Sequence, residues 1–191
     1  EFKDEIITIN EIDTDGCIRP ETSLESMAQL KPAFDKEGVV TAGTSSPLTD
    51  GAAAVIVCSE KYAKDNNLEI MAYIRGMAIS GCNPEIMGIG PVISSQKALK
   101  RAGINLEDID IIEMNEAFAA QSLACVKELG MDMSKLNIHG GAIAMGHPLG
   151  ASGARITGKA ASLLQKQNKR YALSTMCVGG GQGCATVLER G

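Results

Sequence analysis

The 191-residue sequence contains no tryptophan, and aromatic residues make up only 3% of it. It also lacks an excess of basic residues, since 23 acidic side chains outnumber 18 basic ones. Without a positively charged surface, the chain is not expected to bind nucleic acid. It has no apolar run long enough to span a membrane, and its first residues contain no apolar signal-peptide core. The sequence therefore predicts a cytoplasmic protein with neither a membrane nor a nucleic-acid partner.

The six cysteines form no Cys-x-x-Cys pair, so the usual spacing of a zinc site or a redox motif is absent. In a chain without a secretion signal, we expect these thiols to be reduced. We therefore expect no disulfide framework and no bound metal. Glycine, in contrast, is abundant at 21 of 191 residues, which indicates many tight turns or close backbone approaches.

Strands and helices alternate in the region after residue 70. Apolar stretches bounded by turn residues predict strands at 71–79, 109–114, 171–177 and 184–189, and a short extended piece at 136–138. Helical spacing predicts helices at 91–102, 116–129 and 151–167, of which the first two end at Gly103 and Gly130. This βαβαβαββ order is typical of an α/β domain with a mixed, mainly parallel sheet and helices on both faces.

The first 69 residues follow a different pattern. Residues 1–48 are rich in turn formers and predict a loop region with one short helix at 25–30. Residues 52–58 form the longest apolar run and predict a buried strand, followed by a helix at 60–66. One strand and one helix cannot form a domain, so we expect their partners to lie outside this chain.

Two glycine-rich stretches suggest nucleotide binding, but neither meets its requirements. Residues 153–160 resemble a phosphate loop, yet Ala160 replaces the Ser or Thr that holds Mg²⁺, and the stretch lies inside a predicted amphipathic helix. Residues 179–183 lack the third glycine of a dinucleotide fingerprint, because Thr186 stands in its place, and a strand follows them. The glycines must therefore have another purpose.

Three loops at the ends of strands or helices contain residues able to do chemistry, and open α/β sheets bind ligands at such loops. Asn115 follows the strand at 109–114, where it is either a functional amide or only the N-cap of the next helix. His147 lies between a glycine and a proline, with structural and catalytic roles both open. Cys177 ends a strand just before Gly179, whose N–H could receive an oxyanion; buried packing is the alternative role for this thiol.

Together these loops resemble the C-terminal half of a thiolase. The resemblance rests on the motif Asn-Glu-Ala-Phe-Ala at 115–119, on Gly-His-Pro at 146–148 within residues 140–155, and on the Cys177 loop through residue 183. Residues 32–35, 40–43 and 50–54 match the family as well, so the resemblance covers almost the whole chain. It implies a thiolase-like fold, normally built from two similar α/β domains and a loop domain in one longer chain.

The resemblance also implies how this chain is divided. On that template, residues 1–48 are the tail of the loop domain, residues 49–69 are the last strand and helix of the N-terminal domain, and residues 70–191 form the C-terminal domain. The N-terminal thiolase half, in the same or a separate chain, is then an expected partner. The complete protein is expected to form a homodimer or homotetramer.

The implied activity is that of an acyltransferase of fatty acid metabolism, which cleaves 3-ketoacyl-CoA with coenzyme A or condenses acetyl-CoA in reverse. Coenzyme A is then a substrate, and no cofactor is expected to be bound permanently. The family's covalent nucleophile is a cysteine of the first half, so this chain alone is expected to be inactive. The competing interpretation is a non-catalytic thiolase-like scaffold or partner subunit.

Motif by motif, the resemblance implies four catalytic groups in this half. Cys177 would be the acid/base that moves the α-proton, and His147 would activate the nucleophile and help hold the thioester oxygen of the enolate. Asn115 would position a water in the same oxyanion hole, and the Gly179 N–H would contribute to a second one.

Contacts to the pantetheine arm of coenzyme A map, by the same resemblance, to Ser46, Leu48, Met87 and Phe118. The stretch Thr-Ser-Ser-Pro at 44–47 looks more like degradative 3-ketoacyl-CoA thiolases than like acetoacetyl-CoA thiolases. The loop domain largely sets the acyl chain length and is mostly missing here. Acetoacetyl-CoA and longer substrates therefore both remain open.

Overall fold

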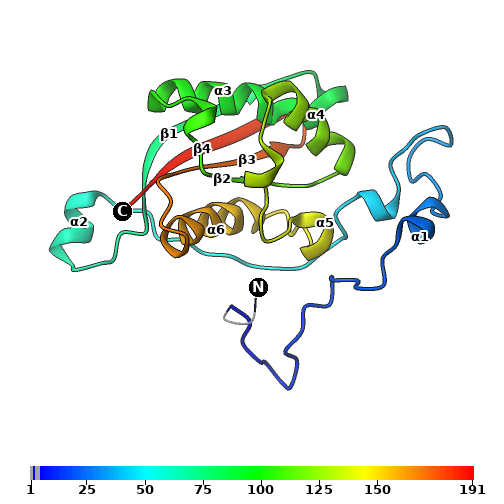
Figure 1. Ribbon diagram of the computed structural model, residues 1–191, viewed down its shortest axis with the longest axis horizontal. Coiled ribbons are helices and arrows are strands. Elements are labelled where there is room, and N and C mark those ends of the chain that lie inside the picture. Colours follow the sequence, from blue (N-terminus) through cyan, green and yellow to red (C-terminus); the bar gives the residue numbers. More distant parts are fainter. Residues whose placement is uncertain (1, 3–4) are drawn as a thin grey trace.

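The computed structural model describes residue 2 and residues 5–191. Its four strands form one mixed sheet in the order β1-β4-β3-β2 (Figure 1). The strands are β1 (Ala72–Gly81), β2 (Ile111–Met114), β3 (Tyr171–Val178) and β4 (Gln182–Arg190). The sheet pairs β2 with β3 in parallel, whereas β4 runs antiparallel to both of its neighbours, β3 and β1.

The prediction of a mixed α/β sheet is confirmed. The sheet is mainly parallel in the directions of its strands, but not in the way neighbouring strands pair. Three of the four strands point the same way, yet two of the three pairings in the described sheet are antiparallel. The reason is the short turn at 179–181, which returns the chain beside β3 as a hairpin. A connection this short can join only antiparallel strands, so β4 comes to lie between β3 and β1.

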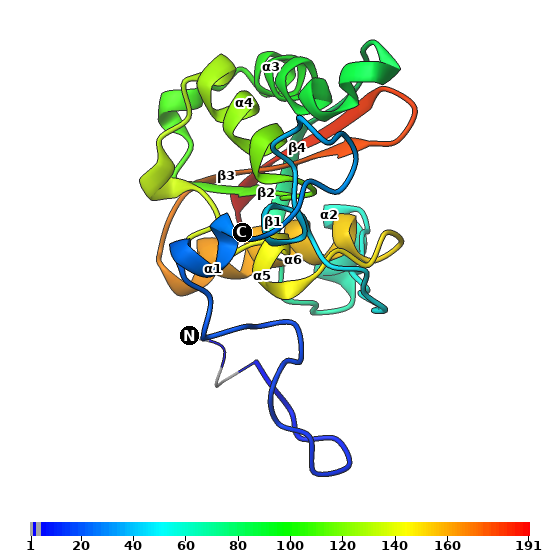
Figure 2. The same ribbon diagram turned by 90° about the vertical axis from the view of Figure 1, so that its right-hand side faces the viewer.

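Helices cover both faces of the sheet, as predicted. Helices α3 (Gly90–Ala102) and α4 (Ala119–Leu129) lie on one face, and α5 (Ala142–Met145) and α6 (Ser152–Lys166) lie on the other (Figures 1 and 2). The remaining helices are α1 (Leu24–Ala28) and α2 (Glu60–Asp65), and short 3-10 turns span Ala42–Thr44, Pro84–Ile89, Leu106–Asp108 and Met133–Lys135. Helix α4 begins three residues after the predicted start at residue 116.

Strand alternation divides the buried apolar side chains between two cores. On β2, Ile112 belongs to the core beneath α3 and α4, whereas its neighbour Ile111 belongs to the core beneath α6. On β3, Leu173 and Ala172 divide in the same way. A strand buried on both faces is predominantly apolar along its length, which is why these strands were predictable from the sequence.

The glycine content is partly explained by how closely α3 approaches the sheet. A Cβ on Gly90, the first residue of α3, would overlap the backbone carbonyl of Gln182 on β4. A Cβ on Gly76 of β1 would overlap the carbonyl oxygen of Ala98 in the same helix. Only glycine permits backbones to approach this closely.

The strand predicted at 52–58 is wrong. These residues are exposed and belong to no strand; they run as an extended segment beneath α5 and α6 in Figure 1. The segment runs close to α6, because a Cβ at Gly158 would lie 3.4 Å from the Val55 side chain. A strand needs neighbouring strands to pair its backbone, and no described strand lies alongside this segment. The helix predicted next is confirmed as α2.

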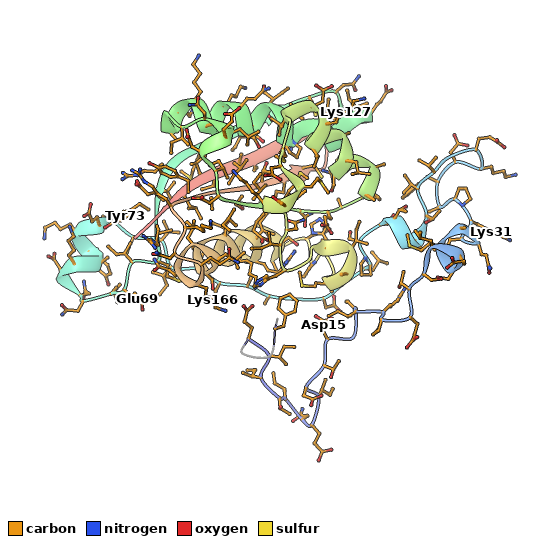
Figure 3. All side chains as sticks on the ribbon, in the orientation of Figure 1. Asp15, Lys31, Glu69, Tyr73, Lys127 and Lys166 are labelled. Carbon is orange, nitrogen blue, oxygen red and sulfur yellow. The ribbon has the colours of Figure 1, made fainter. Side chains whose placement is uncertain are left out.

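The middle of the segment before residue 48 extends away from the sheet (Figure 1), whereas Glu5 forms ion pairs with Lys159 and Lys166 of α6. Figure 3 shows Asp15 and Lys31 on this segment, remote from the side chains packed between sheet and helices. Its predicted short helix is confirmed as α1, which contains no buried residue. Within the described residues, every helix is too short or too polar to cross a bilayer.

Candidate active site

Asn115 and Cys177 lie at the same edge of the sheet. Asn115 directly follows β2, Cys177 is the penultimate residue of β3, and these two strands are parallel neighbours. The Asn115 N–H donates a hydrogen bond of 3.0 Å to the Thr175 carbonyl oxygen, which continues the ladder beyond β2. The carboxyl ends of adjacent parallel strands thus bring the two candidate loops together, at the edge where such sheets bind ligands.

The Asn115 side chain is fully buried, and among the described residues neither its Oδ1 nor its Nδ2 has a hydrogen-bond partner. Helix α4 begins only at Ala119 with Phe118 at its N-cap, so the N-cap interpretation of Asn115 is wrong. Leaving a buried amide without a partner costs free energy, because the group loses its hydrogen bonds to water. This amide is therefore available to hold a polar ligand.

His147 is held from both sides in a loop between α5 and α6. Its N–H donates to Thr49 Oγ1 at 3.2 Å, and its ring Nδ1 lies 2.6 Å from Ser152 Oγ. The Ser152 Oγ also lies 3.1 Å from the Pro148 carbonyl oxygen; in the tautomer in which the hydroxyl donates there, the His147 Nδ1 donates to Ser152. The neutral ring then carries no proton on Nε2, which is free to accept one.

Burial lowers the pKa of His147, and the nearby positive charge of Arg155 lowers it further. Both effects disfavour the charged imidazolium. The ring is therefore neutral at pH 7, and its Nε2 can act as a base.

Cys177 is 5% exposed, and burial raises the pKa of its thiol to about 11. At neutral pH the thiol is therefore protonated. Since the thiolate is the reactive nucleophile, this environment suits a proton donor better than an acyl carrier. Gly179 follows in the exposed turn after β3, where a Cβ would meet nothing within 4 Å.

Hydrogen bonds place two of the four residues expected to contact pantetheine on adjoining segments. Ser46 donates from both its N–H and its Oγ to the Ala117 carbonyl oxygen, at 3.0 and 3.2 Å, beside Phe118. Leu48 is fully exposed. Met87 lies on a separate segment, in the 3-10 turn Pro84–Ile89, which packs against α4. The hydrogen bonds thus join the segments of Ser46 and Phe118 only.

Sequence reasoning missed a buried acid, Glu113, in the middle of β2. Its side chain is 2% exposed, and its Oε1 has no hydrogen-bond partner among the described residues. Burial raises the pKa of Glu113 to about 7, although the positive charges of Arg155 and Lys159 oppose the rise. A charged residue inside the apolar run at 109–114 was the signal available in the sequence. The described residues contain no cluster of His, Cys, Asp or Glu arranged to bind a metal ion.

Glu113 should make the stability of the chain depend on pH. Its pKa is higher in the folded state, about 7, than its ordinary value of 4.5, so the folded state binds the proton more tightly and loses stability as pH rises between these values. Glutamine at this position cannot ionise, so the free energy of unfolding of Glu113→Gln should not fall in the same way. Between pH 4 and pH 8 the variant should gain about 3 kcal/mol of stability relative to the wild type. Urea unfolding at the two pH values measures this.

The exposed Glu128→Gln variant is the matched control, since it loses the same charge outside the core. A difference between wild type and Glu113→Gln that stays constant with pH would show that Glu113 is not a buried titrating acid.

Two protein-family models match the chain. Residues 68–190 match the thiolase C-terminal domain, and residues 1–61 match the thiolase N-terminal domain. Among curated proteins, the 3-ketoacyl-CoA thiolase of Vibrio parahaemolyticus serotype O3:K6 (strain RIMD 2210633) is 54% identical over 203 residues, an alignment that covers 99% of this chain and 52% of that protein.

Solved structures give the same result. The crystal structure of human mitochondrial 3-ketoacyl-CoA thiolase superimposes with a TM-score of 0.91 at 49% identity, covering 94% of this chain and 45% of that one. The same human enzyme in complex with CoA gives a TM-score of 0.88 at 47% identity, covering 94% and 46%. The chain therefore spans about half the length of the relatives it matches.

Proposed function

This chain belongs to the thiolase family, and we propose from that membership that it supplies the C-terminal half of a thiolase. The complete protein would cleave 3-ketoacyl-CoA with coenzyme A, or condense acetyl-CoA in the reverse direction. One observation carries the proposal: the buried Asn115 amide, which has no hydrogen-bond partner among the described residues, and the buried, protonated Cys177 thiol share one sheet edge. A scaffold would have no chemical need for such a pair.

In this proposal the chain contributes three segments to the complete protein. Residues 1–48 complete the loop domain, residues 49–69 complete the N-terminal domain, and residues 70–191 form the C-terminal domain. The exposed apolar residues Val55, Ile56 and Val57 support the second assignment, because a strand of the missing half would pair with them and cover them. We also propose that the complete protein is a cytoplasmic homodimer or homotetramer.

The chemistry needs a nucleophile that this half does not supply. In thiolysis, a cysteine thiolate of the first half attacks the 3-keto carbon, and the bond between C2 and C3 of the substrate breaks. The electron pair goes to C2 as the enolate of acetyl-CoA, while the acyl group stays on the nucleophile. Coenzyme A then takes up the acyl group. His147 is suited to remove the nucleophile's proton, since burial and the charge of Arg155 lower its pKa and keep the ring neutral at pH 7.

The residues of this half act on the enolate. The Cys177 thiol protonates C2, which releases acetyl-CoA, and the same sulfur removes the α-proton in condensation. Asn115, through a bound water, and His147 stabilise the thioester oxygen, where negative charge develops. The Gly179 N–H stabilises the oxyanion formed at the other carbonyl.

Coenzyme A is the proposed substrate, with no permanently bound cofactor or metal. The human relative solved in complex with CoA supports this choice. We assign the pantetheine arm to the surface around Ser46 and Phe118, with Leu48 and Met87 as outer contacts. In this proposal the loop domain sets which acyl chain lengths the complete protein accepts.

The location of the acyl group tests the proposal. The complete protein is made by joining the first half of the Vibrio parahaemolyticus thiolase to this chain, and it is then incubated with acetyl-CoA and digested for mass spectrometry. We expect one acetyl group on a cysteine of the first half and none on the six cysteines of this chain. This chain alone is the control and should gain no acetyl group. An acetyl group on Cys177, or none anywhere, would contradict the proposal.

A further inference from the structure

We propose that Glu116 is a positioning residue that fixes the His147 loop, residues 140–148, against the end of β2 beside Asn115. The inference rests on the proposed function, because it assigns Glu116 the task of setting the geometry of the oxyanion hole. Glu116 itself need not touch the substrate.

The Glu116 carboxylate joins two segments that are distant in sequence. Its Oε1 accepts a hydrogen bond of 2.6 Å from Asn137 Nδ2, and its Oε2 accepts one of 3.2 Å from the Ile143 N–H. These partners lie 21 and 27 residues further along the chain. One carboxylate therefore holds the segment after β2, the segment at 136–138 and helix α5 in a fixed relation.

The bond to Ile143 replaces a cap that α5 lacks. Helix α5 begins after Gly141, which has no side chain to accept a hydrogen bond from the first-turn N–H groups. Such groups need an acceptor from elsewhere when they are shielded from water. Glu116 supplies that acceptor, and α5 leads directly into Gly146 and His147. The position of His147 thus depends on an anchor four residues before it.

Gly141 is shaped to receive the Glu116 carboxylate. Gly141 is buried, and a Cβ at this position would overlap the carboxyl group of Glu116. Its φ of −131° is accessible to any residue, so the need for glycine here comes from Glu116 and not from the backbone. The loop and the carboxylate therefore fit as a pair.

Asn137 connects this arrangement to the rigid sheet. Its Oδ1 accepts from the Met114 N–H at 2.9 Å, and its Nδ2 donates to the Met114 carbonyl oxygen at 2.8 Å. Its own N–H donates to the Ile112 carbonyl oxygen at 2.8 Å. With φ at 44°, the position also favours asparagine over most other residues. The clamp formed by Glu116 and Asn137 is thus built on the outer edge of β2.

The test compares two variants of the complete protein. In Glu116→Gln the side chain keeps one oxygen, so either Asn137 or Ile143 loses its acceptor. Because the clamp orients catalytic groups without binding CoA, we expect kcat to fall about 10- to 100-fold while KM for CoA stays within about twofold. In the 191-residue chain, hydrogen exchange of the Ile143 amide should become faster.

Asp110→Asn is the matched control at the opposite end of β2. The Asp110 Oδ2 accepts hydrogen bonds from the Arg170 and Tyr171 N–H groups, at 2.9 and 3.1 Å, so the variant also removes a carboxylate bound to backbone. We expect Asp110→Asn to leave kcat and Ile143 exchange unchanged, because its amide oxygen can still accept both bonds and they lie away from the His147 loop.

Should Glu116→Gln fail to fold, Gly141→Ala disturbs the same carboxylate from the other side and carries the same expectations. Wild-type kcat in the clamp variant, or an equal loss of kcat in Asp110→Asn, would overturn the inference and leave the proposed function standing. A complete wild-type protein without thiolysis would overturn the proposed function instead. The inference can then still be tested without activity. Hydrogen exchange of the Ile143 amide that is no faster in the Glu116→Gln variant of the 191-residue chain would overturn it.

Discussion

Replacing Cys177 by serine is expected to lower the rate of thiolysis by the complete protein by about 10²- to 10⁴-fold, the range that general acid–base groups contribute. A serine hydroxyl is a far weaker acid than the thiol, whose pKa is about 11 here, so it cannot protonate C2 of the enolate effectively. Acetyl transfer from acetyl-CoA to the first half should persist, because that step expels CoA and forms no enolate. Steady-state thiolysis and the acetyl label measure the two steps separately.

Cys125→Ser is the matched control for this substitution. Cys125 is also a fully buried thiol, but it donates to the Gly88 carbonyl oxygen at 3.3 Å from within α4, a bond that serine can keep. We expect this variant to retain thiolysis. If Cys177→Ser kept near-normal thiolysis, or if both variants lost it equally, Cys177 would be a packing residue and not the acid.

The sequence was informative where the structure depends on local pattern. Strands β2 and β3 are largely buried on both faces, so each was visible as a predominantly apolar stretch. The left-handed conformation at Gly103 and Gly130 ends α3 and α4 where the glycines predicted. Asn115 follows β2 and Cys177 lies near the end of β3, and both side chains can take part in catalysis. Their loops could therefore be chosen as candidate sites from the sequence, before the structure showed that they lie at the same edge of the sheet.

The failures have non-local causes. Residues 52–58 have the composition of a buried strand, but a strand forms only beside others, and the described residues offer it none. The start of α4 was predicted too early because the pattern at 116–118 is compatible with a helix. In the structure Phe118 is extended and pairs with Ser45, and the Ala117 carbonyl oxygen accepts from the Ser46 N–H.

The clamp residues were not predictable for a related reason. Glu116 is polar and next to a candidate site, but nothing in its neighbours indicates that its partners are Asn137 and Ile143, in segments that follow much later. Side-chain hydrogen bonds across such separations leave no periodic trace in a single sequence. The geometry of the site was therefore accessible only from the structure.

We propose that this chain holds the acid/base and oxyanion groups of a thiolase but not its nucleophile. Cys177, the cysteine near the end of β3, is protonated at neutral pH, which suits an acid/base group better than an acyl carrier. The effect of adding the first half should consequently be a change from no turnover to turnover, larger than that of any single substitution in this half.

The most direct measurement is the loss of acetoacetyl-CoA enolate absorbance on addition of free CoA. It is made on the 191-residue chain alone and on the complete protein at equal concentration. We predict no rate above the uncatalysed background for the chain alone and sustained thiolysis for the complete protein. Thiolysis by the chain alone would contradict the account, because one of its own cysteines would then be carrying the acyl group.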